Sequence, residues 1–524
     1  MAEHHLRNLV GRLSVFLACL VSVLAVSSLS LLNPHIGGLD EAHNLMDGVF
    51  FRDFFYDLPF TNLKNYPIDY YKQYPALGFI FWPPLFPFVE GLFFTVGGIS
   101  LLTAQISVLF FGVVLALSCF YLLKQTTQYI HAFFGSLLLI TLPGLYPYFN
   151  SIMREIPTLA MMALALSVYL QVTKTTHRAF WKWQLFAVFA SAALYTKQTA
   201  FILLIAVAID MVTNHRGHLK QLGPWFALLS FTVITAPLLV FTLVYGKANL
   251  AQSVGSNTQL IMSDYAGPGR WSVESWLYYP AALTDFLNPV LTLLFVVALV
   301  FAISSRDALK KNALYLTWIG AFYLIFSFFD NKSERFLSLI AIPIVILTTT
   351  VIWDVFKLLR NRSQRFAPVV LLACSGLSIT HLTDTKIHSI KGAADIVKNF
   401  DVSKTDGNFA YFGSYRQIFV YLIRVKDQQR NHYILQGDDL FQNPDNVLAT
   451  LNDYRVRYIF VEPGNLSEQE DAAVKRLTGL SQVSLAYSGS FYRSDQEIEL
   501  VVLRNDAALP DSMKSISLSS GLIE

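Results

Sequence analysis

Two adjacent carboxylates, Asp40 and Glu41, follow the first long apolar run of the sequence and a pair of glycines. A carboxylate can take the proton from an acceptor hydroxyl, whose own pKa lies far above 7. If residues 37–60 form a helix, steps of about 100° per residue separate a polar face from an apolar one. The polar face then holds Asp40, His43, Asn44 and Asp47, and the apolar face holds Leu45, Met46 and Val49. This pattern predicts a helix on a membrane surface with its acids turned outward, although a plain amphipathic connector would carry the same pattern.

Charged side chains also stand at the ends of later apolar runs. They are Arg154 and Glu155 in YFNSIMREIP, Lys197 in LYTKQTA, Asp264 and Arg270 in MSDYAGPGRW, and Asp330, Lys332, Glu334 and Arg335 in FFDNKSERF. Ionisable groups at a membrane edge are costly to bury, and they usually face a cavity or pair with one another. Arg and Lys could hold a phosphate that departs with its charge while a carboxylate serves as base. The plainer alternatives are span caps or ion pairs, for Arg154 and Glu155, and membrane-interface anchors, for the two lysines and Arg335.

The composition indicates a membrane protein. Hydrophobic residues make up 54% of the 524-residue chain and charged residues only 14%, whereas soluble domains carry about 25% charged residues. The net charge of +3 is too small to suggest a nucleic-acid partner. The three cysteines lie within apolar runs and have neither a disulfide framework nor zinc-ligand spacing.

The charges of the connecting loops predict the topology. Arg7 and Arg12 precede the apolar run 13–32, so the N-terminus is expected in the cytoplasm and residues 33–102 on the outer face. Within that loop, an aromatic and proline-rich stretch and a run of about a dozen apolar residues predict interfacial or re-entrant helices. Further apolar runs lie at 103–123, 130–148, 157–173, 183–196, 198–213, 223–245, 281–304, 313–329, 335–356 and 366–382. The Lys/Arg-rich connectors between them all fall on the cytoplasmic side of an eleven-span arrangement, which agrees with the positive-inside tendency.

The pattern changes from about residue 383, where hydrophobicity drops. GNFAYFG, HYILQG, RYIFVEP, VSLAYSG and IELVVL are typical of strands, and RQIFVYLIRVKD, NVLATLNDYRV and EQEDAAVKRL are typical of helices. Alternating strands and helices predict a small α/β domain with a partly parallel sheet. The sequence therefore predicts an α-helical polytopic membrane domain at 1–382, with 33–102 as its first external loop, and an extracytoplasmic α/β domain at 383–524. The latter contains no phosphate-binding glycine loop and no nucleophile elbow.

The order of these motifs resembles the GT-C integral-membrane glycosyltransferases, in the branch of protein O-mannosyltransferases and aminoarabinose transferases (glycosyltransferase family 39/83-like). DEAHN is similar to the family's acidic loop, and YPALGFIFWPPLFPF to its aromatic Pro-Pro-Leu segment. YFNSIMREIPTLAMM, LYTKQTA and KSERFLSLIAIP resemble its Ser/Arg element, its Thr-Lys turn and its Arg-aromatic run to a proline. The resemblance extends approximately over residues 10–350, and it does not extend to the loop 246–280 or to the tail from 383.

The resemblance implies a GT-C fold and transfer of a sugar, usually with inversion, from a polyprenyl-phosphate donor to an acceptor hydroxyl on the outer face. It implies Asp40 as general base, Glu41 as a partner that orients the acceptor or supports Asp40, and as ligands of the lipid phosphate Arg154, Lys197 and Arg335. Lys332 is a further candidate for donor binding, and the candidates for substrate contacts are His43, Tyr74, Trp82, Glu155, Asp264 and Arg270. No cofactor is expected because no metal-ligand spacing is present, although a divalent cation at Asp40 and Glu41 stays open.

Two other functions stay open. A surface-glycan polymerase or ligase would use the same kind of lipid-linked substrate. A transporter or flippase would need ionisable residues at mid-span and an alternating-access repeat, whereas the charges here lie at span ends. The expected partners are a polyprenyl-phosphate-linked sugar, an acceptor lipid, glycan or protein, and the bilayer. The expected location is a bacterial inner or plasma membrane, with a cytoplasmic N-terminus and an extracytoplasmic C-terminal domain.

Overall fold

The structure is a computed structural model, and it describes residues 2–175, 180–247, 269–359, 363–382, 385, 387–437 and 446–516. The chain forms two compact units. The helical unit is Met1–Leu32, Ile80–Phe86 and Gln105–Lys386, and the mixed unit is Asn33–Phe79, Pro87–Ala104 and Ile387–Glu524. Most of the predicted first external loop therefore belongs to the same compact unit as the C-terminal residues, while a domain boundary at residue 382 stays a prediction.

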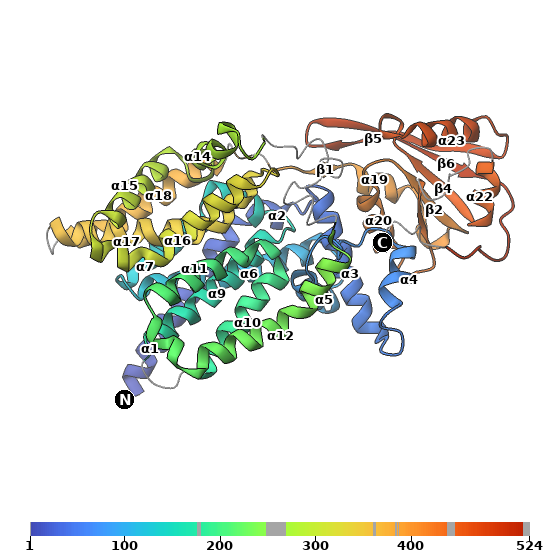
Figure 1. The fold of residues 1–524 in the computed structure, drawn as a ribbon. Helices are drawn as coiled ribbons and strands as arrows, with labels where there is room; N and C mark the ends of the chain where they lie inside the picture. The colour runs from blue at the N-terminus through green and yellow to red at the C-terminus, as the bar shows by residue number, and fades with distance from the viewer. Residues whose placement is uncertain are drawn as a thin grey trace. The chain divides into compact units, whose positions relative to one another are not determined.

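The helical unit is built from helices along the predicted apolar runs (Figure 1). They are α1 (Ala2–Val26), α2 (Ser28–Leu32), α6 (Leu101–Lys124), α7 (Tyr129–Ile140), α8 (Tyr146–Phe149), α9 (Glu155–Thr173), α10 (Phe180–Thr196), α11 (Phe201–Thr213), α12 (Leu222–Val244), α14 (Val273–Leu287), α15 (Pro289–Ile303), α16 (Arg306–Phe328), α17 (Ala341–Leu359) and α18 (Ala367–Leu382). Short 3-10 turns precede or connect several of them: η1 (Pro143–Leu145), η2 (Gln198–Ala200), η3 (Arg216–Lys220), η5 (Glu334–Ile340) and η6 (Ser363–Phe366). Long apolar runs form helices here because a helix satisfies its own backbone hydrogen bonds in lipid.

Five helices of the described part are long and apolar enough to cross a membrane: Leu101–Lys124, Glu155–Thr173, Leu222–Val244, Glu334–Leu359 and Gln364–Leu382. A sixth crossing results if Tyr129–Ile140 and Pro143–Phe149, which are bent by 55° at their break, form one span. The other predicted spans are shorter or more polar helices, such as Pro289–Ile303. The prediction of an α-helical polytopic membrane protein is confirmed, and the count of eleven crossings stays a prediction.

The mixed unit combines helices from the N-terminal part of the chain with a sheet domain from its C-terminal part. The helices are α3 (Leu39–Asp57), α4 (Tyr66–Gln73) and most of α5 (Leu85–Gly97). The sheet domain contains β1 (Ile390–Lys391), α19 (Ala393–Lys398), η7 (Val402–Lys404), β2 (Asn408–Phe412), α20 (Arg416–Lys426), β3 (Ile434–Gln436), α22 (Val447–Asp453), β4 (Val456–Val461), η9 (Pro463–Asn465), α23 (Glu468–Thr478), β5 (Val483–Arg493) and β6 (Gln496–Asn505). The sequence pattern predicts five of these strands and the helices α20, α22 and α23, and it misses the short β1 and α19.

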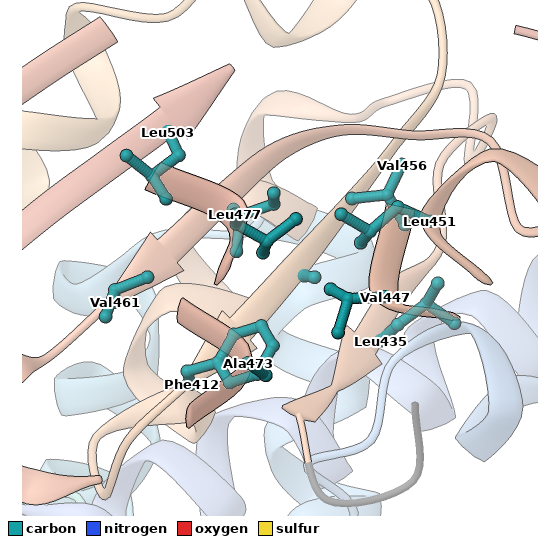
Figure 2. Packing of buried hydrophobic residues seen from close by; sticks show 11 residues of the cluster. Phe412, Leu435, Val447, Leu451, Val456, Val461, Ala473, Leu477 and Leu503 are labelled. Carbon is teal, nitrogen blue, oxygen red and sulfur yellow. The ribbon is translucent and has the colours of Figure 1, made fainter. Parts of the chain in front are cut away.

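The six strands have the order β1-β5-β6-β4-β2-β3. β2 runs parallel to β3 and β4, whereas β4 with β6, β6 with β5 and β5 with β1 are antiparallel. Figure 2 shows the apolar core that α22 and α23 form with the sheet: Ala410, Phe412, Leu435, Val447, Leu451, Val456, Ile459, Val461, Ala473, Leu477 and Leu503. The alternate residues of β2 face α20, where the rings of Tyr411 and Phe419 have centroids 5.0 Å apart. The prediction of an α/β domain with a partly parallel sheet is confirmed.

Helix α3 differs from the predicted surface helix. Its apolar face is buried as expected, but Glu41, Asn44 and Asp47 are buried as well. The chain after α4 folds back over this polar face, where Oδ1 of Asp47 accepts a 2.8 Å hydrogen bond from the N–H of Gly78. The prediction that the polar face of this helix is turned outward is therefore wrong for Asn44 and Asp47, while its place at a membrane surface stays a prediction. Periodicity shows that a face is polar, and it cannot show that a later segment supplies that face with hydrogen-bond donors.

Glu462 fills the place at the carboxyl ends of parallel strands where α/β folds usually bind ligands. It directly follows β4 and is fully buried. Its carboxylate accepts hydrogen bonds from the N–H groups of Ser414 (3.0 Å) and Tyr415 (2.8 Å) ahead of α20, from the side chain of Asn465 (2.8 Å) and from the hydroxyl of Tyr411. The positive end of α20 thus has an internal anion, which agrees with the absence of a phosphate-binding glycine loop from this part of the sequence.

Glu462→Gln is expected to destabilise the sheet domain by about 3 kcal/mol, because an amide nitrogen would face N–H groups that lose a charged acceptor. Thermal unfolding of the full chain in detergent and proteolysis near residues 410–415 would measure the effect. The exposed Glu468→Gln, at the start of α23, is the matched control. Equal stability of the two variants would contradict the role given to Glu462.

Candidate active site

Charged side chains from distant parts of the helical unit meet beside the start of α9. Glu155 is the first residue of α9, Lys197 lies between α10 and η2, and Arg335 lies in η5 ahead of α17. Nζ of Lys197 is 2.5 Å from Oε1 of Glu155, and only 12% and 1% of these side chains are exposed. Arg335 acts electrostatically on the Glu155 carboxylate. The structure therefore brings together residues that lie as much as 180 positions apart in the sequence.

Arg154 stands at the same helix start and is buried. Its guanidinium donates a hydrogen bond to the carbonyl of Pro83 and lies over the ring of Trp82, 5.4 Å from the ring centre. Contact of an arginine with an aromatic face is favourable because the face is negative. The Pro-Pro segment thus holds a cation of the site, in addition to the shaping role that its sequence suggests. We refer to Arg154, Glu155, Lys197 and Arg335 as the charged cluster.

Two aromatic residues beside the charged cluster are missed by the sequence reasoning. Nζ of Lys197 lies 6.0 Å from the ring centre of Phe336, and the guanidinium carbon of Arg335 lies 5.7 Å from the same centre. Tyr148 interacts electrostatically with both Glu155 and Arg335. The position of Tyr148 a few residues before Arg154 and Glu155 suggests a place near the charged cluster. Helical periodicity cannot predict the orientation of its side chain, because the chain bends between α7 and α8.

Asn150 fixes the chain just ahead of the charged cluster. Its side-chain amide donates to the carbonyl of Val26 at 2.9 Å and to that of Tyr146 at 3.1 Å. Its Oδ1 accepts from the backbone N–H of Ser30 at 3.1 Å. These bonds tie the turn that leads into α9 to the end of α1 and to α2, and they restrict where the charged cluster can lie.

Lys332 is placed differently from the expected donor-binding role. It is buried beyond the end of α16 and donates to the carbonyls of Phe326 (2.9 Å), Ser327 (2.6 Å) and Phe329 (2.5 Å). Burial lowers the pKa of Lys332 to about 8, so its ammonium is still protonated at neutral pH and offers three donors. Three carbonyls at the C-terminus of α16 accept these three hydrogen bonds. Lys332 therefore caps the helix and has no N–H left to donate to a phosphate.

Lys332→Met is therefore expected to lower the stability of the helical unit by about 2 kcal/mol, because it leaves carbonyls at the end of α16 without donors. The affinity for a polyprenyl phosphate, the ligand that the family resemblance implies, should stay within about twofold, since no phosphate contact is removed. Thermal unfolding and lipid titration of the purified protein would separate the two effects. The control is the exposed Lys310→Met near the other end of α16, and a large loss of lipid affinity at Lys332 alone would restore it as a phosphate ligand.

Arg270 is engaged by Asp330. Its backbone N–H and Nε donate to Oδ1 at 3.0 and 3.2 Å, and its Nη2 donates to Oδ2. The hydrogen bonds from Arg270 lower the pKa of Asp330. This pair links the residues ahead of α14 to the end of α16, while a substrate contact of Arg270 stays a prediction. Asp264, its predicted companion, lies outside the described residues.

In the mixed unit, Asp40 and Glu41 occupy the first turn of α3, where the helix dipole favours negative side chains. Glu41 is buried, and its Oε1 accepts a 3.0 Å hydrogen bond from the N–H of Gly37. A side chain at position 37 would have no room, since a Cβ there would lie 2.2 Å from that oxygen. Asp40 is half-buried. Glu41 thus closes the start of the helix, and Asp40 is the more accessible of the two acids.

The two other predicted contacts in this unit have protein partners. Nδ1 of His43 lies 2.8 Å from the carbonyl oxygen of Ala76. Tyr74 is fully buried, and its hydroxyl donates to Oδ2 of Asp427 at 2.9 Å. Burial leaves Tyr74 no surface for a substrate, so its predicted contact is not supported. No group of three or more His, Cys, Asp or Glu side chains able to hold a metal ion occurs among the residues that the structure describes.

Comparison with known proteins identifies the fold. The sequence model for dolichyl-phosphate-mannose-protein mannosyltransferases matches residues 82–241, which include Trp82 and all of the charged cluster except Arg335. No curated protein sequence matches the chain. The structure of ArnT from Cupriavidus metallidurans bound to undecaprenyl phosphate aligns over 96% of this chain and 99% of that one, with a TM-score of 0.62 and 14% identity. The chain has the GT-C fold.

Two other GT-C structures are also similar. Archaeal oligosaccharyltransferase AglB from Archaeoglobus fulgidus, in complex with an inhibitory peptide and a dolichol-phosphate, aligns over 86% of this chain and 69% of that one, with a TM-score of 0.54 and 10% identity. Arabinofuranosyltransferase AftD from Mycobacteria aligns over 95% of this chain and 42% of that one, with a TM-score of 0.53 and 12% identity. The resemblance to membrane glycosyltransferases of the mannosyltransferase and ArnT type is thereby confirmed.

Proposed function

We propose that this GT-C chain moves a sugar from a polyprenyl-phosphate donor to an acceptor hydroxyl on the extracytoplasmic face of a bacterial inner or plasma membrane. The observation that carries the proposal is the charged cluster, in which Lys197 and Arg335 act on the carboxylate of Glu155 and Arg154 stands at the same helix start, held by Pro83 and Trp82. The excess of positive charge suits a phosphate. The mannosyltransferase match and the undecaprenyl phosphate and dolichol-phosphate held by ArnT and AglB support the same class of donor.

In the proposed reaction the acceptor oxygen attacks the anomeric carbon of the donor sugar and forms the new glycosidic bond. The carboxylate of Asp40 takes the hydroxyl proton. The bond between the anomeric carbon and the phosphate oxygen breaks, and the polyprenyl phosphate leaves with the bonding electron pair. Attack on the side opposite to the leaving group inverts the configuration at that carbon.

The charged cluster would act mainly on the leaving group. The donor phosphodiester carries one negative charge, and the departing phosphomonoester gains a second one as the bond breaks. Fixed cations stabilise this transition state more than the bound donor, which is the requirement for a higher rate. Arg154 and Arg335 offer paired donors to phosphate oxygens, and Lys197 offers a point charge. Glu155 would hold Lys197 in place before the lipid phosphate binds.

The experiment is a transfer assay with the full chain in proteoliposomes. The donors are undecaprenyl phosphates carrying labelled mannose or aminoarabinose, offered with lipid, glycan and peptide acceptors, and mass analysis identifies the product. A single added sugar and released undecaprenyl phosphate are expected. Label that crosses the bilayer without a new glycosidic bond would indicate a transporter or flippase, and a product that grows by many units or by block addition would indicate a polymerase or ligase.

A further inference from the structure

Helix α3, which carries Asp40 in its first turn, is held by the C-terminal sheet domain at its beginning. The N–H of Ile390, in β1, donates a 2.7 Å hydrogen bond to the carbonyl of Ile36, and the two residues form an antiparallel bridge. A Cβ at position 37 would lie 3.0 Å from the carbonyl oxygen of His388. The chain that enters α3 therefore lies directly against the chain that enters the sheet, four residues before Asp40.

A buried ion pair holds α3 near its other end, where α20 packs against it (Figure 1). Nη2 of Arg424 lies 2.5 Å from Oδ2 of Asp53, and each side chain is 1% exposed. The same oxygen accepts a 2.8 Å hydrogen bond from the hydroxyl of Tyr70 in α4. Nη1 of Arg424 donates to the carbonyl of Asp427 at 3.0 Å, and its charge lies over the ring of Tyr74. The ion pair and the Arg424–Tyr74 contact join residues of 39–74 to Arg424, while Asp53 also pairs within its own helix with Arg52, whose Nη1 lies 2.8 Å from Oδ1.

A second pair lies one helical turn further on the same face of α3. Arg430 donates from both Nη atoms to the carboxylate of Asp57, which also accepts a 2.7 Å hydrogen bond from Tyr66. The hydrogen bond from Arg430 lowers the pKa of Asp57. Nε2 of Gln73 donates to the carbonyls of Arg430 (2.6 Å) and His432 (3.1 Å). The turn after α20 is thus held between α3 and α4.

A buried ion pair is weak evidence for stability, because the cost of removing two charges from water can exceed their attraction. Apolar side chains would join α3 to α20 without that desolvation cost. The cost is not fully offset here, because Nε of Arg424 has no hydrogen-bond partner among the described residues. The pair instead fixes the orientation of α3 against α20. Two planar charged groups restrict the rotation of a helix about its axis and its shift along that axis more narrowly than apolar contacts do. About 20 Å of helix separates Asp53 from Asp40, and a helix transmits such a constraint as a stiff rod.

We propose that the C-terminal sheet domain positions the Asp40 carboxylate by holding α3 at both ends, with Asp53 and Arg424 as positioning residues. The inference rests on the proposed function only in taking Asp40 as the general base. It gives the sheet domain a defined part in the reaction: the domain orients the base and leaves donor binding to the charged cluster. This differs from a role in binding the acceptor, for which the domain would need an open site.

The test compares Arg424→Met, Asp53→Asn and their double variant with the wild type as full-length protein. Both kcat per folded molecule and the amide hydrogen exchange of residues 36–44 are measured. Each single variant is expected to lower kcat about 10- to 100-fold, as a misplaced catalytic group does, and to speed exchange in 36–44. The double variant should lose little more than either single one, because the two act through one contact. Affinity for undecaprenyl phosphate should not change. Lys475→Met, which breaks the exposed pair with Asp471 on α23, is the control.

The outcomes separate the two proposals. An unchanged kcat, or a lower kcat without faster exchange in 36–44, would overturn the positioning role while the proposed transfer stands. Absence of any sugar transfer by the wild type would overturn the proposed function, and the exchange measurement would still decide whether Asp53 and Arg424 hold the start of α3. If Arg424→Met does not fold, Asp53→Asn keeps the side-chain volume and Arg424→Lys keeps the charge, and the same two measurements apply to them.

Discussion

Asp40→Asn should lower kcat for sugar transfer by about 10²- to 10⁴-fold, the usual contribution of a general base. An amide of the same size cannot take the acceptor proton at neutral pH, while the helix start that Glu41 and Gly37 build remains intact. Binding of undecaprenyl phosphate should be unaffected, because the proposed phosphate ligands are untouched. A steady-state transfer assay, lipid titration and thermal unfolding of the purified variant would show the pattern.

The exposed Asp69→Asn in α4 is the control for that experiment, since it removes a carboxylate of the same unit. A companion variant, Glu41→Gln, should mainly lower the stability of the protein, whereas Asp40→Asn should mainly lower kcat. Glu41→Gln weakens the hydrogen bond that closes the start of α3, so it should cost stability together with a smaller loss of kcat. Near-normal turnover by Asp40→Asn, or a larger loss at Glu41 than at Asp40, would show that the wrong acid has been assigned as base.

Arg335→Gln should weaken binding of undecaprenyl phosphate about 10- to 100-fold, the cost of losing a charged hydrogen-bond donor. The loss in kcat/KM for transfer should be larger than the loss in ground-state affinity for the donor, because the phosphate gains charge as it leaves. Arg335→Lys should recover only part of the effect, since an ammonium replaces two parallel donors with a point charge.

The matched control for Arg335 is Arg365→Gln, an exposed arginine of η6 in the same unit. A further comparison uses Glu155→Gln, which removes the partner of Lys197 and leaves the three cations. Lipid phosphate should bind this variant at least as tightly, although it should be less stable because a buried ammonium loses its counter-charge. Equal lipid affinity of Arg335→Gln and the wild type would remove Arg335 from the proposed phosphate site.

Local patterns were sufficient for much of the fold. Apolar runs and basic loops predict the helices of the membrane part, because lipid leaves a chain few alternatives to a helix. Alternation of polar and apolar residues predicts five of the strands, and the short β1 is missed because two residues carry no period. The start of α3 also follows from its sequence, since two glycines and two acids are a strong helix-start signal.

Long-range contacts limited the prediction of the site. The charges at span ends could be named from the sequence, but Lys332 and Arg335, three positions apart, have different surroundings that no local pattern distinguishes. Lys332 turns back to cap α16, whereas Arg335 lies beside Glu155 and Phe336. The burial of Tyr74 and the polar contacts of α3 were likewise hidden, because their partners lie between about 30 and 370 residues away.

The sequence by itself therefore determined the membrane character, the α/β tail, the family resemblance and the pair of acids at 40 and 41. These follow from composition, from periodicity and from motifs of a few residues. Only the tertiary structure decided that Glu41 closes a helix, that Lys197 and Arg335 act on Glu155, and that Asp53 pairs with Arg424 across 371 positions. Whether a charge is buried depends on which distant segment covers it. The free energy of burying that charge depends on the contacts made by the whole packed chain, so no single stretch of sequence can predict it.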